Sequence, residues 1–218
     1  HSIGEYVAAV LAGVMSLQDG TRLVAARGRL MQALPGGGML SVRLSEAELR
    51  PMVAAPLGIA AINSPRQCVV SGPTAELECF REQLEARGIG SRQLRTSHAF
   101  HSPMMEPMLA EFEAELARCQ LGRAELPILS TLTGDWLAQD GMGHRQYWLD
   151  QIRSAVRFSD AAARLVQDAN RILLEVGPGQ TLSTLVQQQS QRARQMIPSL
   201  PPVERPGEYR AILGALGR

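Results

Sequence analysis

The first residues of the chain contain a serine that could act as a nucleophile. Ser2 stands in the stretch His-Ser-Ile-Gly-Glu, directly before an Ala- and Val-rich segment that predicts a helix over residues 5–12. A serine followed two residues later by glycine forms the second half of the G-x-S-x-G elbow, a strained strand-to-helix turn that exposes the hydroxyl. In such a turn the N–H of Ile3 would face a developing oxyanion. The alternative is a serine that only caps a helix.

Two histidines in one loop are candidate general bases for this serine. His98 and His101 lie in Thr-Ser-His-Ala-Phe-His-Ser, between a predicted strand and a predicted helix. A base for Ser2 must be a neutral imidazole within hydrogen-bond reach of the hydroxyl. Spacing alone does not choose between the two histidines.

An arginine interrupts an apolar stripe on the helix predicted over residues 16–34. Arg27 lies three or four residues from apolar neighbours on both sides, so it shares their face. A buried guanidinium is unfavourable unless it is paired. Arg27 therefore either pairs with a carboxylate elsewhere in the fold or binds a substrate carboxylate with its planar fork. The stripe consists of Leu23, Val24, Leu30, Met31 and Leu34.

The composition indicates a globular protein of one or two domains. The chain has 218 residues, 45% of them apolar, which is enough for a hydrophobic core. Its net charge of +1 gives no indication of nucleic-acid binding. No apolar run approaches the roughly 18 residues of a membrane helix. Cys68, Cys79 and Cys119 have no metal-site or disulfide spacing, and free thiols favour a reducing cytoplasm.

The middle of the chain predicts an inserted subdomain. Its predicted elements follow the order β-α-β-β-α-β, which is the ferredoxin-like unit. The strands are expected over 39–43, 57–62, 67–71 and 91–96, and the helices over 45–53 and 74–87.

The segments on either side of this insertion predict the core of the protein. Strands that alternate with helices imply a parallel sheet. We therefore expect a core formed by residues 1–36 and 99–218 and an insert formed by residues 37–98. Beyond the insert, helices are expected over 104–119, 147–154 and 160–168, from residue 181 and after Pro206, and strands over 128–133 and 171–176 and near Met196.

Six short stretches together match one known family. In order along the chain they are HSIGE, RGRLMQ, NSPRQCVVSG, SHAFHS, VRF and EVGPG. The chain resembles the acyltransferase domains of modular type I polyketide synthases, which are related to malonyl-CoA:acyl-carrier-protein transacylases. The resemblance covers essentially the whole chain. It implies an α/β fold in which an α/β-hydrolase-like parallel-sheet core carries a ferredoxin-like insert.

The resemblance also assigns roles to the candidate residues. It implies that Ser2 is the nucleophile, that His101 is the general base and that Arg27 binds the malonyl carboxylate. The N–H of Ile3 is implied to bind the oxyanion. In this family a backbone carbonyl replaces the acid of a catalytic triad, and we expect that carbonyl at Arg157.

The residues before the implied base resemble a specificity signature. The tetrad of His98, Ala99, Phe100 and His101 is similar to that of malonyl-specific domains, and Ile3 also resembles the malonyl form of the elbow. The ring of Phe100 would occupy the space that an α-methyl group needs. One methyl group in such a pocket is worth about 1–3 kcal/mol, so the expected selectivity is finite.

The implied reaction loads malonyl from malonyl-CoA, through an ester on Ser2, onto the phosphopantetheine thiol of an acyl carrier protein during polyketide chain extension. It implies no bound cofactor and no metal. The expected setting is a cytoplasmic, multifunctional enzyme of antibiotic biosynthesis that binds neither nucleic acid nor membrane. The expected partners are the carrier protein, a neighbouring ketosynthase domain and an N-terminal part of the acyltransferase, which would bring the first strands and a second oxyanion donor.

Two alternatives to this reaction stay open. The first is a serine hydrolase that acts on thioesters, which would use Ser2 and His101 without needing Arg27. The second is an inactive, truncated fragment of an acyltransferase domain, because the resemblance implies a segment before the elbow.

Overall fold

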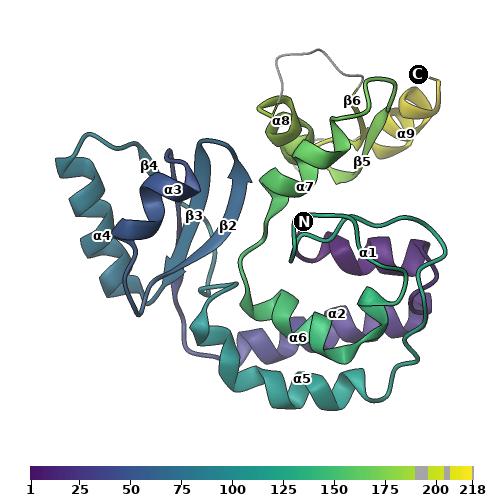
Figure 1. Cartoon of the computed structure of the whole chain (residues 1–218), viewed down its shortest axis with the longest axis horizontal. Coiled ribbons are helices and arrows are strands. Elements are labelled where there is room, and N and C mark those ends of the chain that lie inside the picture. The colour runs from purple at the N-terminus through teal and green to yellow at the C-terminus, as the bar shows by residue number, and fades with distance from the viewer. Residues whose placement is uncertain (190–195, 204–206, 218) are drawn as a thin grey trace. The chain divides into compact units, whose positions relative to one another are not determined.

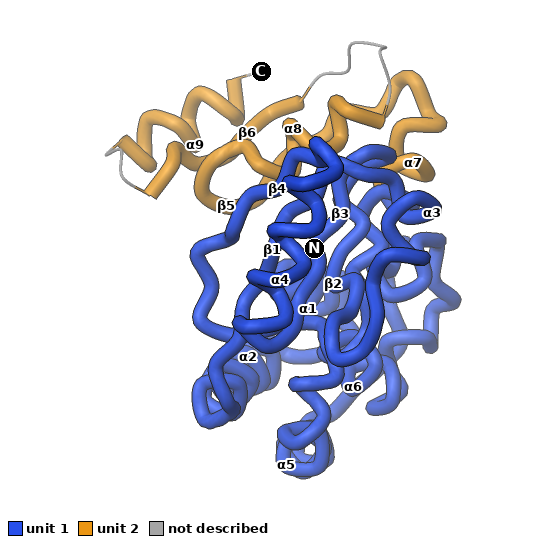
Figure 2. The backbone as a smooth tube through the Cα atoms, turned by 90° about the vertical axis from the view of Figure 1, so that its left-hand side faces the viewer, with its two compact units in different colours: residues 1–161 blue, residues 162–218 orange. Residues whose placement is uncertain are grey.

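The computed structural model describes residues 1–189, 196–203 and 207–217. The chain forms two units, residues 1–161 and residues 162–218, which are coloured separately in Figure 2. Pro206, after which the last predicted helix is expected to begin, and Arg218, the last residue of the predicted core, lie outside the described residues. The division into a core and an insert at residues 37–98 stays a prediction.

One half of the first unit is helical (Figure 1). Buried apolar side chains from its helices, among them Tyr6, Leu23, Phe112 and Trp148, form one cluster. The hydroxyl of Ser16 accepts a hydrogen bond from the N–H of Asp19 and so caps the start of α2. The helices of this half are α1 (Gly4–Leu11), α2 (Leu17–Gln32), α5 (Leu109–Leu116) and α6 (Arg145–Arg153), with 3-10 turns η2 (Pro103–Met108) and η3 (Gly141–Gly143).

The other half of the first unit is an antiparallel sheet with the predicted β-α-β-β-α-β order. The strand order is β2-β3-β1-β4, and one face carries a separate apolar cluster that includes Leu40, Val70 and Leu77. A Cβ at Gly37 would lie 2.9 Å from the Cβ of Ala99, so glycine permits the two connecting segments to cross. The elements are β1 (Gly38–Val42), α3 (Glu46–Leu49), η1 (Arg50–Met52), β2 (Gly58–Ser64), β3 (Gln67–Gly72), α4 (Thr74–Ala86) and β4 (Ser91–Gln93).

The second unit contains a short parallel sheet. The carboxylate of Glu175 accepts hydrogen bonds from the N–H groups of Leu182 and Ser183 and so holds the start of a helix. The predicted strand over 171–176 forms and pairs with β6 alone in the described residues, and Leu174 and Val176 on one of its faces are exposed. The elements are β5 (Leu173–Pro178), α8 (Thr181–Gln187), β6 (Met196–Leu200) and α9 (Glu208–Leu216), and α7 (Phe158–Leu165) spans the boundary of the units.

The prediction of a strand over residues 128–133 is wrong. This segment makes a single antiparallel bridge, between Leu129 and Trp136, and otherwise forms turns. The cause is local, because the hydroxyl of Ser130 accepts hydrogen bonds from the N–H groups of Leu132 and Thr133 and closes a turn that competes with a strand. None of the helices in the described residues is both long and apolar enough to cross a membrane.

A buried carboxylate connects three segments of the first unit. Glu5 lies in the first turn of α1 and is only 3% exposed. Its oxygens accept hydrogen bonds from the N–H of Thr131 at 2.9 Å and from the hydroxyl of the same residue at 2.7 Å. The hydroxyl of Tyr147 and the side-chain amide of Gln151 are further donors, both on α6. The donors supply the compensation that a buried carboxylate requires.

The same network reaches the main chain of Ser2. The side-chain amide of Gln151 donates to the Ser2 carbonyl at 2.9 Å and to Glu5 at 3.2 Å. Burial, with the neighbouring carboxylate, raises the pKa of Tyr147, so its hydroxyl stays protonated and keeps donating. The start of α1 is therefore attached to α6 by side-chain hydrogen bonds.

We predict that Glu5→Gln lowers the free energy of unfolding by about 1–3 kcal/mol, because the amide replaces an acceptor oxygen by an NH2 group that faces other donors. Urea unfolding followed by circular dichroism measures this change. The matched control is Glu113→Gln on α5, an exposed position, where we expect a change below about 0.5 kcal/mol. Equal stabilities of the two variants would contradict the structural role of the buried carboxylate.

Candidate active site

Ser2 occupies a strained turn at the entrance to α1. Its φ angle is 48°, in the left-handed region that is uncommon for residues other than glycine. The N–H groups of Gly4 and Glu5 bond back to the carbonyls of His1 and Ser2, so the helical turn begins at the serine itself. The N–H of Ile3 donates no hydrogen bond within the described residues. It is thus available to an oxygen bound beside Ser2.

His101 contacts the hydroxyl of Ser2 directly. Its Nε2 lies 2.7 Å from Ser2 Oγ, and its Nδ1 lies 3.0 Å from the carbonyl oxygen of Ser154. Because a carbonyl can only accept, Nδ1 carries the proton, and Nε2 is left to accept the hydrogen bond of the Ser2 hydroxyl. His101 is also left-handed, with a φ angle of 56°. Backbone strain of this kind concentrates at functional sites.

The carbonyl that orients His101 is not that of Arg157, as predicted, but that of Ser154. Ser154 follows the last residue of α6, where carbonyl groups have no partner within the helix. Arg157 lies three residues farther on, and its guanidinium pairs with Glu46 and Asp160. The sequence motif therefore predicted the correct segment, but the carbonyl that contacts His101 belongs to the residue directly after α6.

His101 is neutral at neutral pH. The side chain is buried, and burial lowers its pKa from 6.5 to about 4, with a further contribution from the positive charge of Arg27. A neutral imidazole whose free nitrogen faces a serine hydroxyl has the protonation state of a general base. Ser2 and His101 therefore form a nucleophile and base pair that a main-chain carbonyl completes.

Arg27 is the third side chain at this point. It lies on α2 and is 5% exposed, and its Nη2 donates to Ser2 Oγ at 2.9 Å. The guanidinium also lies over the ring of Tyr6, with its central carbon 5.6 Å from the ring centroid. The carboxylate partner that a structural role would require is absent, since no ion pair of Arg27 occurs among the described residues.

Two nitrogens of Arg27 are left without partners. Nε and Nη1 are buried and donate no hydrogen bond within the described residues. Burial lowers the pKa of Arg27, while Tyr6 and Glu5 act in the opposite direction. A buried guanidinium with unsatisfied donors is a favourable site for an anion, because a carboxylate would satisfy donors that otherwise remain desolvated.

The other residues of the tetrad line or support the cavity. His98 does not reach Ser2, because its Nε2 donates to the carbonyl of Leu34 at 3.2 Å and its Nδ1 lies 2.7 Å from Ser97 Oγ. Ala99 is fully buried against Gly37. Phe100 lines the cavity, with its ring centroid 6.1 Å from that of His98.

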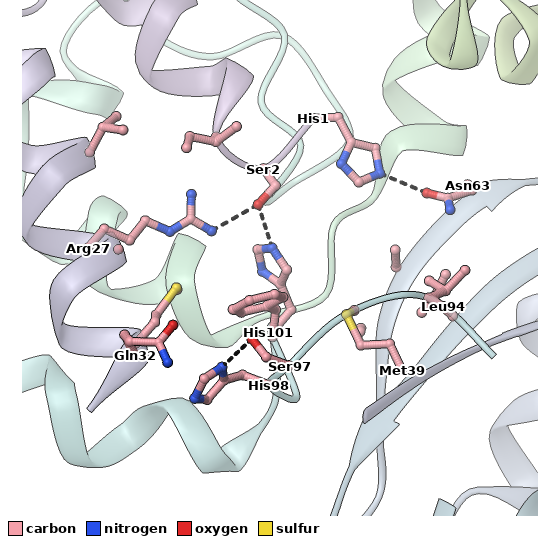
Figure 3. Close-up of a pocket in the computed structure, with 18 residues that line it drawn as sticks. His1, Ser2, Arg27, Gln32, Met39, Asn63, Leu94, Ser97, His98 and His101 are labelled. Carbon is pink, nitrogen blue, oxygen red and sulfur yellow. Dashed lines mark hydrogen bonds between the residues drawn. The ribbon is translucent and has the colours of Figure 1, made fainter. Parts of the chain in front are cut away.

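The predicted site residues Ser2, Ile3, Arg27, His98, Phe100 and His101 all line one cavity of about 550 Å³ (Figure 3). Its lining residues come from the helical half of the first unit and from one face of the four-stranded sheet β2-β3-β1-β4. His1 adds a contact across it, because its Nε2 lies 2.8 Å from Oδ1 of Asn63 on β2. Apolar side chains form much of the remaining wall, among them Val24, Met31, Met39, Val69 and Leu94.

Sequence reasoning missed the residues that hold this arrangement. Glu5 stands in the same motif as Ser2, and an acid in the first turn of an apolar helix was the available signal. For Gln151 the sequence gives a weaker indication, which is an amide side chain that follows the aromatic residues Tyr147 and Trp148 on the same helix. Ser154 acts through its carbonyl, which leaves no mark in the sequence.

Comparisons with known proteins identify the same family. The family model described as "Acyl transferase domain" matches residues 1–216. The phenolphthiocerol synthesis polyketide synthase type I Pks15/1 of Mycobacterium marinum is 41% identical over 220 residues, which cover 100% of this chain and 10% of that protein. The chain therefore spans about a tenth of the length of this relative.

Solved structures agree with the fold. The acyl transferase domain of SpnD, in complex with 2-(pent-4-yn-1-yl)malonyl, superposes with a TM-score of 0.94 at 32% identity, covering 100% of this chain and 54% of that one. The malonyl CoA-acyl carrier protein transacylase of Clostridium perfringens gives a TM-score of 0.85 at 26% identity, covering 99% and 69%.

The matches confirm the predicted fold class, an α/β-hydrolase-like core with a small subdomain. The match of the family model to nearly all of the sequence agrees with the six motifs. The chain belongs to the acyl transferase domain family, as it occurs in polyketide synthases.

Proposed function

We propose that this chain transfers malonyl from malonyl-CoA, through an ester on Ser2, to the phosphopantetheine thiol of an acyl carrier protein during polyketide chain extension. The observation that carries the proposal is the buried guanidinium of Arg27, which contacts Ser2 Oγ and has two unpartnered nitrogens. In a malonyl ester on Ser2, the free carboxylate is separated from the ester carbonyl by one CH2 group. It would therefore lie within reach of Arg27.

The first half-reaction begins with the hydrogen bond between Ser2 and His101. As Oγ attacks the thioester carbonyl, its proton moves to Nε2 of His101, and the N–H of Ile3 donates to the developing oxyanion. Nδ1 keeps its proton and its bond to the Ser154 carbonyl, which stabilises the imidazolium. The C–S bond then breaks, and the CoA thiolate takes the proton from Nε2.

The second half-reaction reverses these steps with a new thiol. The carrier thiol gives its proton to Nε2 of His101 and attacks the ester carbonyl. The ester C–O bond breaks, and Ser2 Oγ recovers the proton from Nε2. No cofactor or metal takes part, because proton transfer and oxyanion binding are supplied by this chain.

The setting of the reaction belongs to the same proposal. The partners are an acyl carrier protein and a ketosynthase domain of the same synthase. The location is the cytoplasm, where malonyl-CoA is available. The predicted division, with residues 37–98 as an insert in a core of residues 1–36 and 99–218, would make the cavity an inter-subdomain site.

Removing Arg27 tests the proposal directly. We expect Arg27→Ala to lower kcat/KM for malonyl-CoA relative to acetyl-CoA by roughly 10- to 150-fold, because about 1.5–3 kcal/mol of charge-assisted hydrogen bonding to the carboxylate is lost. The acyl-Ser2 ester is measured by mass spectrometry of the purified protein in competition between the two thioesters. Arg29→Ala is the matched control, because Arg29 lies exposed on the same helix.

An unchanged malonyl preference in Arg27→Ala would contradict carboxylate recognition. The same samples separate transfer from hydrolysis. A transferase should release its acyl group much faster when the carrier thiol is added, whereas a thioester hydrolase should release it to water at the same rate with or without that thiol.

The low pKa of His101 predicts a wide pH range for Ser2 reactivity. Only the neutral imidazole accepts the Ser2 proton, so reactivity is present above the pKa and is lost as the pH falls through about 4. Labelling of Ser2 by a fluorophosphonate measures this rate, and circular dichroism at each pH checks the fold. His98→Ala should keep the labelling and His101→Ala should lose it. A midpoint near 6.5 would show that His101 is solvated.

Phe100 is predicted to exclude an α-methyl group. Phe100→Ser should shift the kcat/KM ratio of methylmalonyl-CoA to malonyl-CoA by roughly 10- to 200-fold, the effect of one methyl group in a pocket. The ring lines the cavity, and serine would vacate that volume unless the walls collapse. Competition between the two thioesters, read on Ser2, provides the ratio. An unchanged ratio in a folded variant that still loads malonyl would place the selectivity elsewhere.

A further inference from the structure

A second hollow lies on the insert sheet, separate from the Ser2 cavity. It has a volume of about 430 Å³. None of its described lining residues carries a carboxylate, and two of them are arginines. These residues are Ser41, Arg43, Gln67, Gly90, Ser91 and Arg92.

The hollow and the Ser2 cavity lie on the same face of the sheet. Side chains two residues apart on a strand point to the same face. Each of three neighbouring segments has one residue that lines the Ser2 cavity and another, two positions along the chain, that lines the hollow. These pairs are Met39 and Ser41 on β1, Val69 and Gln67 on β3, and Leu94 and Arg92 at β4.

The strand register supports this continuity. Ser41 lies opposite Arg92 in the antiparallel pair of β1 and β4. One step closer to the cavity, the N–H of Leu94 donates to the carbonyl of Met39 at 2.9 Å. The opposite face of the sheet is covered by its own apolar cluster. An extended molecule could therefore leave the cavity along the open face and reach the hollow.

The two arginines of the hollow have free positive charges. Arg43 and Arg92 are exposed, and neither guanidinium makes an ion pair or hydrogen bond among the described residues. By contrast, Arg50 and Arg81 on the same insert each pair with a glutamate of their own segment. A Cβ at Gly90 would lie 3.3 Å from Cδ of Arg43, so glycine leaves room for the arginine stem.

Polar groups lie between the cavity and the arginines. The side-chain amide of Gln67 donates to Ser41 Oγ at 3.3 Å, and both side chains line the hollow. The four-residue step along β1 from Met39 to Arg43 covers about 13 Å. A pantetheine arm has the matching pattern, with a reactive thiol end, two amide groups along its length and a phosphate at the far end.

We infer that the open face of the insert sheet binds the pantetheine arm of the thioester, with its phosphate held by Arg43 and Arg92. The inference rests on the proposed transfer reaction and identifies the part of the substrate that lies outside the Ser2 cavity. The shared chemistry is a phosphate on a pantetheine arm. Coenzyme A and the carrier protein both supply that group.

The test compares a donor that carries the whole arm and its phosphate with a donor that ends after the first amide group. Ser2 acylation is measured with malonyl-CoA and with malonyl-N-acetylcysteamine, which lacks the phosphate, for a variant with both Arg43→Ala and Arg92→Ala. We expect the KM for malonyl-CoA to rise about tenfold, as for two exposed charge contacts, and to become less sensitive to salt. Acylation by malonyl-N-acetylcysteamine should not change.

A second double variant controls for the loss of two charges. Arg66 and Arg87 also lie exposed on the insert but do not line the hollow, so Arg66→Ala with Arg87→Ala should leave both donors unaffected. Transfer from acyl-Ser2 to holo-carrier protein and to pantetheine without phosphate distinguishes the two sources. If the Arg43 and Arg92 variant slows both CoA and carrier steps, both phosphates use the hollow. If it slows only the CoA step, the hollow binds CoA alone.

The inference is overturned if the KM for malonyl-CoA is unchanged in the Arg43 and Arg92 variant, if both donors lose the same factor, or if the control variant has the same effect. These results would leave the proposed transfer reaction intact as long as malonyl still reaches Ser2. Failure of the unmodified protein to load malonyl from either donor would instead contradict the proposed function.

Discussion

The buried carboxylate of Glu5 is the contact on which the geometry of the first unit depends. It lies one turn from Ser2 and accepts hydrogen bonds from Thr131 and from two residues of α6. The residue after α6, Ser154, holds His101 through its carbonyl. A single buried charge thereby fixes the helix that presents the nucleophile to the helix that orients the base. Removing it from water is tolerated because its oxygens are so fully hydrogen-bonded.

The electrostatics of the cavity follow from the burial of its side chains and from one positive charge. Burial and Arg27 both lower the pKa of His101, so the imidazole is a neutral acceptor for the Ser2 proton. The same burial leaves two nitrogens of Arg27 without hydrogen-bond partners in the part of the chain that the structure describes. An anion bound there would restore hydrogen bonds to the guanidinium and lessen its effect on His101. In the proposed function, substrate binding and proton acceptance would therefore be coupled through one side chain.

The insert sheet completes the site because its two faces differ. One face is covered by an apolar cluster that includes Leu40 and Val70. Because side chains alternate along a strand, the residues between them point to the open face. There, Met39 lines the cavity and Ser41 lines the hollow. The alternation that folds the subdomain thus also determines which residues line the cavity and the hollow.

Sequence patterns were enough to predict the elements that alternate clearly, such as the β-α-β-β-α-β segment, and the motifs around Ser2, Arg27 and His101. Local patterns suffice for these features, because amphipathic periodicity and turn residues act within a few positions. Spacing alone did not choose between His98 and His101, and only the family resemblance implied His101; the folded chain places Nε2 of His101 against Ser2 Oγ and turns His98 toward Leu34. Tertiary structure also decided that Ser154, not Arg157, orients the base, and that residues 128–133 form turns. A main-chain carbonyl has no side-chain signature, and competition between a serine-closed turn and a strand is settled only by the contacts of the folded chain.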